Sequence, residues 1–239
     1  MTADTDPVRV RVVVAAPLDA VWSFLTDPAL IDRWFGWEHD SLDDEIAMIF
    51  VDGASVSREK LRFETNGGGL FLLSESPAGT VVELRRPVED ADPAAGFDGI
   101  DEGWTTFVQQ LRLGVERHRD DPRRAIELAG KHLTPDAPRT WAALGLTPAA
   151  ELEVGARYAA TTPFGEELTG ELWFRSPHQL GLTVDGWGDG LLVAVQRPAD
   201  DERPFGSGQL VLTSYGLDDA AFAAWFERWT RWATENLPG

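Results

Sequence analysis

Each half of this 239-residue chain ends in a long segment whose large apolar residues recur at helical spacing. The two segments are 101–116 and 218–237. The residues that share a face are Trp104, Phe107 and Leu111 in the first segment and Phe222, Trp225 and Trp229 in the second. A face of this kind must be buried against another layer, so the pattern predicts two compact units, each closed by a C-terminal helix.

Short apolar runs with turn residues between them precede both segments. In the first half, 8–14 alternates valine with arginine, as a strand with one buried face does. Further strands are predicted at 45–51, 58–65, 69–75 and 80–86, with a hairpin turn at 66–68. In the second half, strands are predicted at 156–162, 168–175, 180–184, 191–196 and 208–215. Since each half runs from antiparallel strands to an aromatic helix, we interpret the chain as an internal duplication.

The segment between the halves is rich in proline and loses its apolar periodicity. Residues 117–139 are therefore predicted to be a linker, with a short helix at Arg123–Leu128. The predicted domains are 1–116 and 140–239.

A bent pair of helices is predicted near the N-terminus, in APLDAVWSFLTDPALIDRWFG (16–36). Pro17 suits a first helical turn, and Asp27-Pro28 stops that helix before a second one starts near Ala29. Trp34, on the second helix, and Trp37, which follows it, are expected at the mouth of a groove.

The order of these elements is that of a helix-grip fold. APLDAVWSFLTDPALIDRWFG and DEGWTTFVQQLRLGVE resemble the family of proteins similar to the C-terminal domain of the activator of Hsp90 ATPase, within the START-like (SRPBCC, Bet v 1-like) superfamily. The resemblance implies an α+β fold, with an antiparallel sheet wrapped on a long C-terminal helix. Two such units in tandem are expected. The second is expected to be shortened, because only Arg139–Leu146 offers a helix ahead of its strands.

No catalytic or metal-binding pattern stands out in the sequence. The four histidines lack metal-ligand spacing, and the absence of cysteine excludes thiolate sites and disulfides. We therefore predict no catalytic residues, no metal and no cofactor. The formal net charge of -19 argues against nucleic acid as a partner. The sequence has neither a membrane-length apolar run nor a signal-peptide pattern, so we expect no membrane insertion and a cytoplasmic location.

The ten tryptophans are the strongest indication of function. Aromatic side chains beside a groove favour an apolar ligand site, and the superfamily resemblance implies a small hydrophobic or aromatic ligand held without covalent chemistry. The predicted ligand-binding residues are Trp34, Trp37, Phe71, Trp104, Phe107, Leu111, Tyr158, Trp173, Phe222, Trp225 and Trp229.

Two alternatives remain open at this point. The superfamily includes polyketide aromatases and cyclases, and such an enzyme would need polar side chains that converge in a cavity. The candidates are Tyr158, Thr161, Glu171, Arg175 and Tyr215. The other alternative is a protein-interaction module, co-chaperone-like as the family resemblance implies, with a protein partner or a second copy of the chain as a homodimer.

Overall fold

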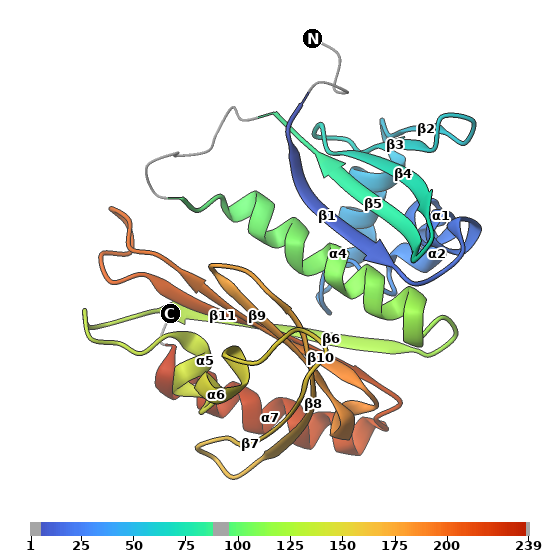
Figure 1. The fold of residues 1–239 in the computed structure, drawn as a ribbon. Helices are drawn as coiled ribbons and strands as arrows, with labels where there is room; N and C mark the ends of the chain where they lie inside the picture. Colours follow the sequence, from blue (N-terminus) through green and yellow to red (C-terminus); the bar gives the residue numbers. More distant parts are fainter. Residues whose placement is uncertain (1–5, 88–95, 238–239) are drawn as a thin grey trace. The chain divides into compact units, whose positions relative to one another are not determined.

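The chain forms two compact units, each built from one antiparallel sheet and one long helix (Figure 1). The computed structural model describes residues 6–87 and 96–237. Unit 1 is Met1–Pro122 and unit 2 is Arg123–Gly239.

The sheet of unit 1 has five strands in the order β1-β5-β4-β3-β2. These strands are β1 (Val8–Val14), β2 (Ser55–Ser57), β3 (Arg62–Glu64), β4 (Leu70–Ser76) and β5 (Gly79–Arg85). Val10, Val12 and Val14 of β1 lie in the core, packed with residues of the long helix α4 (Gly99–Arg117). That helix starts two residues before the segment 101–116 expected from the sequence, because the side chain of Asp98 caps its first turn.

The bent helix pair is confirmed as α1 (Leu18–Thr26) and α2 (Pro28–Ile31). The side chain of Asp27 accepts a hydrogen bond from the backbone N–H of Ala29, and Pro28 occupies the first turn of α2. Aspartate and proline thus end one helix and begin the next.

The strand predicted at 45–51 is wrong. This segment belongs to helix α3 (Leu42–Ile46) and the π-helix η2 (Ala47–Val51). Its apolar residues also fit helical spacing, and Ile46 and Phe50, four residues apart, are both buried in the core. A run of seven residues is too short to distinguish the period of a strand from that of a helix. The segment is helical because this places both Ile46 and Phe50 in the core.

The sheet of unit 2 has six strands in the order β6-β11-β10-β9-β8-β7. They are β6 (Arg123–Lys131), β7 (Arg157–Thr161), β8 (Glu167–Arg175), β9 (Gln179–Val184), β10 (Gly190–Arg197) and β11 (Ser207–Tyr215). The helices of the unit are α5 (Thr140–Ala143), α6 (Thr147–Ala150), the 3-10 turn η3 (Asp185–Trp187) and α7 (Asp219–Asn236). One face of α7 packs on the sheet through its tryptophans.

The helix predicted at Arg123–Leu128 is wrong, and so is the view of this stretch as a connector. It forms the nine-residue strand β6, which pairs with β11 from Arg123↔Tyr215 to Lys131↔Ser207. The partner strand lies far along the chain, so no local pattern could reveal the pairing.

Tandem helix-grip units are confirmed. In both, an edge strand is followed by a helix pair, then by antiparallel strands and a long helix, and the edge strand pairs with the last strand of its unit. Unit 2 is not shortened, since β6, α5 and α6 supply the opening that the sequence seemed to lack. None of the helices within residues 6–87 and 96–237 combines the length and the hydropathy of a membrane span.

Candidate functional site

The core of unit 1 contains an aromatic cluster built from four parts of the chain. Its members are Phe35, Trp37, Phe50, Phe63, Phe71, Trp104 and Phe107. They come from the loop after α2, from η2, from β3 and β4, and from α4. The centroid of Trp104 lies 5.5 Å from that of Phe71 and 6.1 Å from that of Phe50, mostly edge to face. Phe35 and Phe107 are closer still, at 4.6 Å. These spacings are those of favourable aromatic pairs.

One side of this aromatic cluster reaches the surface. Phe35, Phe63 and Phe71 are almost wholly buried, whereas Trp37, Trp104 and Phe107 are half-buried. The rings of Trp37 and Phe107 lie 6.0 Å apart. Within the described residues, the indole N–H of Trp104 has no hydrogen-bond acceptor. The surface side of the cluster therefore offers three ring edges and one open donor.

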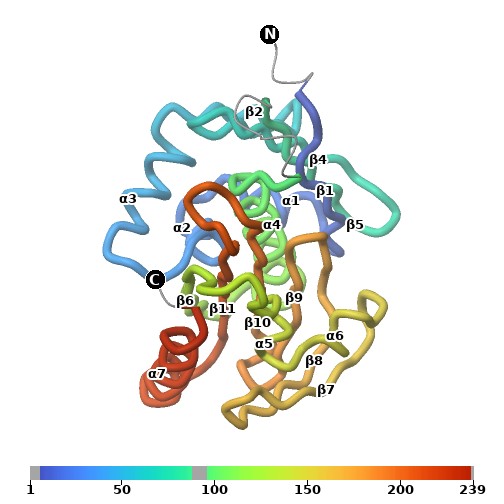
Figure 2. Tube along the Cα trace, turned by 90° about the vertical axis from the view of Figure 1, so that its left-hand side faces the viewer, coloured from blue at the N-terminus to red at the C-terminus, as the bar shows by residue number. Residues whose placement is uncertain are grey.

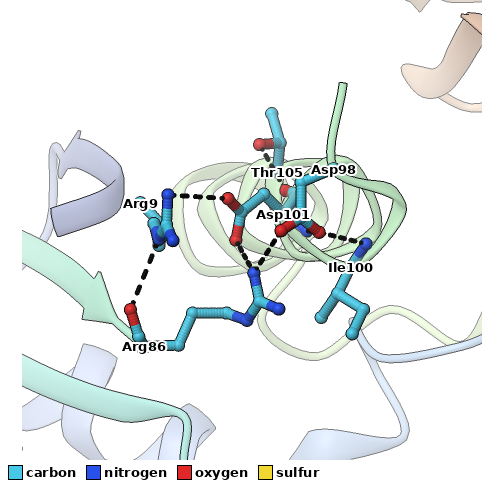
Figure 3. A network of polar contacts seen from close by, with 6 residues as sticks. All are labelled: Arg9, Arg86, Asp98, Ile100, Asp101 and Thr105. Atoms are coloured by element: carbon cyan, nitrogen blue, oxygen red, sulfur yellow. Dashed lines mark hydrogen bonds and ion pairs between the residues drawn. The ribbon is translucent and has the colours of Figure 1, made fainter. Parts of the chain in front are cut away.

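A network of charged side chains holds the N-terminal end of α4, one turn before Trp104 (Figure 3). Arg86, at the end of β5, donates to Asp98 Oδ2 and to Asp101 Oδ1, both at 2.7 Å. Arg9 of β1 lies on the other side of Asp101, at 3.4 Å, and donates to the carbonyl of Arg86. Because the Arg86 side chain is only 9% exposed, these charge-assisted bonds are poorly screened by solvent. The network fixes where α4 begins and thus where Trp104 lies on the sheet.

Asp98 links this network to the pH dependence of stability. Burial alone would raise the pKa of Asp98, but the Arg86 guanidinium and the backbone N–H groups of Asp101 and Ile100 hold that pKa below its usual value. A depressed folded-state pKa stabilises the protein above the unfolded-state value, and this contribution disappears as pH falls through the folded-state pKa.

We expect Asp98→Asn to lower the free energy of unfolding of unit 1 by about 1–2 kcal/mol at pH 7. The difference from the wild-type chain should shrink as the pH falls below about 4, where Asp98 of the unfolded wild-type chain takes up a proton, and should disappear once the pH is below the depressed folded-state pKa. Urea unfolding at a series of pH values measures this. The control is Asp52→Asn, an exposed carboxylate outside the network. If the difference in unfolding free energy between Asp98→Asn and the wild-type chain stayed constant down to pH 3, the Asp98 carboxylate would not stabilise unit 1 through its charge.

Unit 2 uses its aromatic residues differently. The ring centroid of Trp187 lies 5.1 Å from that of Trp225 and 5.4 Å from that of Trp229. All three side chains are buried. The carboxylate of Glu166, in the turn between β7 and β8, accepts hydrogen bonds from the indole N–H groups of Trp187, at 2.9 Å, and Trp229, at 3.1 Å. Arg228 also donates to Glu166, at 2.8 Å. The carboxylate therefore joins the β7–β8 turn, η3 and α7, and the rings of Trp187, Trp225 and Trp229 fill the core where these three elements meet.

The predicted ligand residues fall into two groups, one in each unit. In unit 1, Phe71 and Leu111 are fully buried, and Trp37, Trp104 and Phe107 lie at the surface side of the aromatic cluster. Trp34 is not at a mouth: it is fully buried, and its indole N–H donates to the carbonyl of Phe24 at 2.7 Å.

In unit 2, Phe222, Trp225 and Trp229 line the core side of α7, as expected. Tyr158 lies in the same core, whereas Trp173 falls at an irregularity of β8 and outside the core cluster. The structure thus brings together all of the predicted residues of unit 2 except Trp173.

Three of the five polar candidates for a cyclase, Tyr158, Glu171 and Arg175, do not converge. The hydroxyl of Tyr158 donates to the carbonyl of Thr183 at 2.9 Å, and burial raises its pKa far above the usual range, so this hydroxyl is a structural donor. Glu171 lies opposite Arg157 in the β7–β8 pairing, next to the Tyr158–Gly170 pair and therefore on the other face. Arg175 is exposed and donates to the carbonyl of Ala150.

Sequence analysis missed five residues of these clusters, among them Trp187 of η3. Phe50 was hidden by the incorrect strand. Phe35 was left out although it directly follows Trp34, and Phe63, which lies opposite Phe71 in the β3–β4 pairing, was left out as well. Glu166 could not be found, because nothing in a turn glutamate signals two tryptophan donors from distant elements.

Comparisons with known proteins give a similarity of fold alone. No protein-family model matches the chain, and no curated protein matches it. The chain is similar to the solved structure of the di-domain ARO/CYC StfQ from the steffimycin biosynthetic pathway, with 13% identity, 95% of this chain and 97% of that chain covered, and a TM-score of 0.31. It is also similar to the solved structure of the di-domain ARO/CYC BexL from the BE-7585A biosynthetic pathway, with 14% identity and a TM-score of 0.30. That similarity covers 96% of this chain and 98% of that chain. With TM-scores this low, neither similarity bears on the activity of this chain.

Proposed function

We propose that unit 1 binds a small, uncharged, aromatic or hydrophobic molecule at the surface side of its aromatic cluster. The observation that supports this most directly is the half-buried set of Trp37, Trp104 and Phe107 around an indole N–H that has no acceptor among residues 6–87 and 96–237. Covering such rings removes apolar surface from water, at about 25 cal/mol per Å². A carbonyl or hydroxyl oxygen on the ligand would complete the hydrogen bonding of Trp104.

Charge supports an uncharged ligand rather than an anionic one. Glu38 and Glu102 follow Trp37 and precede Trp104 in the chain, and the whole chain has a formal net charge of -19. An anionic molecule would approach this surface against repulsion. The sequence resemblance to the activator of Hsp90 ATPase family is compatible with such a binder and, like the cytoplasmic location, stays a prediction.

Unit 2 is proposed to have a structural role and no ligand of its own. Its tryptophans are buried, and two of them already donate to Glu166. A ligand in the same place would have to displace packed rings and leave a carboxylate without its donors, which costs more than the ligand would gain.

Native mass spectrometry of the whole chain, followed by denaturing extraction, tests the proposal. We expect either a copurified hydrophobic molecule at one per chain or, for an empty protein, one-to-one binding of the neutral fluorophore N-phenyl-1-naphthylamine. Its fluorescence titration gives the affinity. An empty protein that does not bind this probe, or that binds it only through unit 2, would overturn the proposal.

A further inference from the structure

Unit 1 has a second apolar feature, away from the aromatic cluster. A hollow of about 460 Å³ lies between α2 and the α3–η2 segment. Its floor is made by Ala29, Ile46, Ala47 and Val51, and its rim includes the carboxylates of Asp32 and Asp43. Figure 2 shows the α3–η2 segment at the periphery of unit 1.

Apolar side chains of η2, including Val51 at the hollow, and of the strand β2 are also exposed. Met48 and Val51 are 54% and 49% exposed, and Val56 of the edge strand β2 is 55% exposed. The π-helix explains the first two, because burying Ile46 and Phe50 on one side turns Met48 and Val51 outward. Neighbouring exposed apolar groups around a hollow mark an interaction surface more often than isolated ones do.

The chain segment 27–52, which contains every residue that lines the hollow, is strongly acidic. Eight carboxylates lie between residues 27 and 52, against one basic residue, Arg33, whose guanidinium donates to the carbonyl of Arg119. The carboxylates are Asp27, Asp32, Glu38, Asp40, Asp43, Asp44, Glu45 and Asp52. An apolar floor inside a negative rim is complementary to an apolar anchor flanked by lysine or arginine.

We propose that this hollow docks a basic amphipathic helix of a partner protein. The apolar residues of the partner's helix would pack on Ala47, Val51 and Met48. Its basic residues would face Asp32 and Asp43. A ligand pocket buries most of the surface of a small molecule, and this hollow is too open to solvent to do so. A second copy of this chain would approach with a formal net charge of -19 of its own, so self-association through this face is disfavoured.

The test uses the whole chain and a helical probe peptide of about 14 residues, with leucine at i, i+3, i+4 and i+7 and lysine elsewhere. Binding is followed by ¹H–¹⁵N chemical shifts and by isothermal titration. We expect shift changes confined to residues 28–56. Asp32→Asn with Asp43→Asn should weaken binding about three- to tenfold, and Val51→Asn about fivefold.

Two controls separate this site from general attraction to an acidic protein. Asp136→Asn with Glu153→Gln removes the same charge from exposed positions of unit 2 and should change the affinity less than twofold at moderate salt. A scrambled peptide of the same composition should bind at least about tenfold more weakly, because it has no continuous apolar face. Equal weakening by the two double variants, equal affinity of the scrambled peptide, or shift changes elsewhere would overturn the proposal.

Discussion

Glu166→Ala is expected to destabilise unit 2 by about 3–5 kcal/mol, the largest effect of any single exchange that we predict. The variant leaves the indole N–H groups of Trp187 and Trp229 buried without an acceptor, and each such group costs about 1–3 kcal/mol. It also removes the partner of Arg228, but that side chain is 44% exposed and contributes little.

A neighbouring residue supplies the control for this prediction. Glu167→Gln changes an exposed carboxylate at the next position and should alter the free energy of unfolding by no more than about 0.5 kcal/mol. Urea unfolding gives the stability, and the ¹H–¹⁵N resonances of the two indole groups report the lost hydrogen bonds. If Glu166→Ala behaved like Glu167→Gln, the carboxylate would not be what joins the β7–β8 turn to η3 and α7.

The elements that local pattern could predict are those with a long apolar face. Both closing helices, the strand at 8–14 and the bend at Asp27-Pro28 follow from periodicity and capping alone. The tandem arrangement followed from the repeated order of these elements. The two clear errors, at 45–51 and 123–128, lie where the decisive interaction is distant: the core contacts of Phe50 and the pairing of β6 with β11.

The candidate site was predictable in composition and less so in geometry. Helical spacing correctly placed Trp104, Phe107 and Leu111 on the inner side of α4, but it could not tell a ring at the surface from a ring in the core. Trp34 and Trp37 illustrate the limit, since they are three residues apart and only Trp34 is fully buried. What distinguishes them is the packing of η2, whose Phe50 contacts Trp34 at 5.6 Å.

Trp104→Ala should weaken binding of N-phenyl-1-naphthylamine at least about tenfold. The indole lies among Phe35, Phe50, Phe71 and Phe107, and it supplies half-exposed ring surface at the edge of the aromatic cluster. Loss of a ring face of this size removes about 1.5–3 kcal/mol of contact with an aromatic probe, which corresponds to a change in Kd of about ten- to a hundredfold.

The matched control is Trp22→Ala, which removes a half-buried tryptophan of the same unit. Trp22 lies on α1 beneath the guanidinium of Arg58, at 5.0 Å, and makes no ring contact with the aromatic cluster. This variant should lose stability but retain probe affinity within about twofold. Trp104→Phe removes the indole N–H but keeps an aromatic ring in the site. This variant should lose more affinity for 1-naphthol, whose oxygen can accept a hydrogen bond from the indole, than for naphthalene, which has no acceptor. Equal losses in Trp104→Ala and Trp22→Ala would show that probe binding follows the stability of unit 1 and does not involve the ring of Trp104.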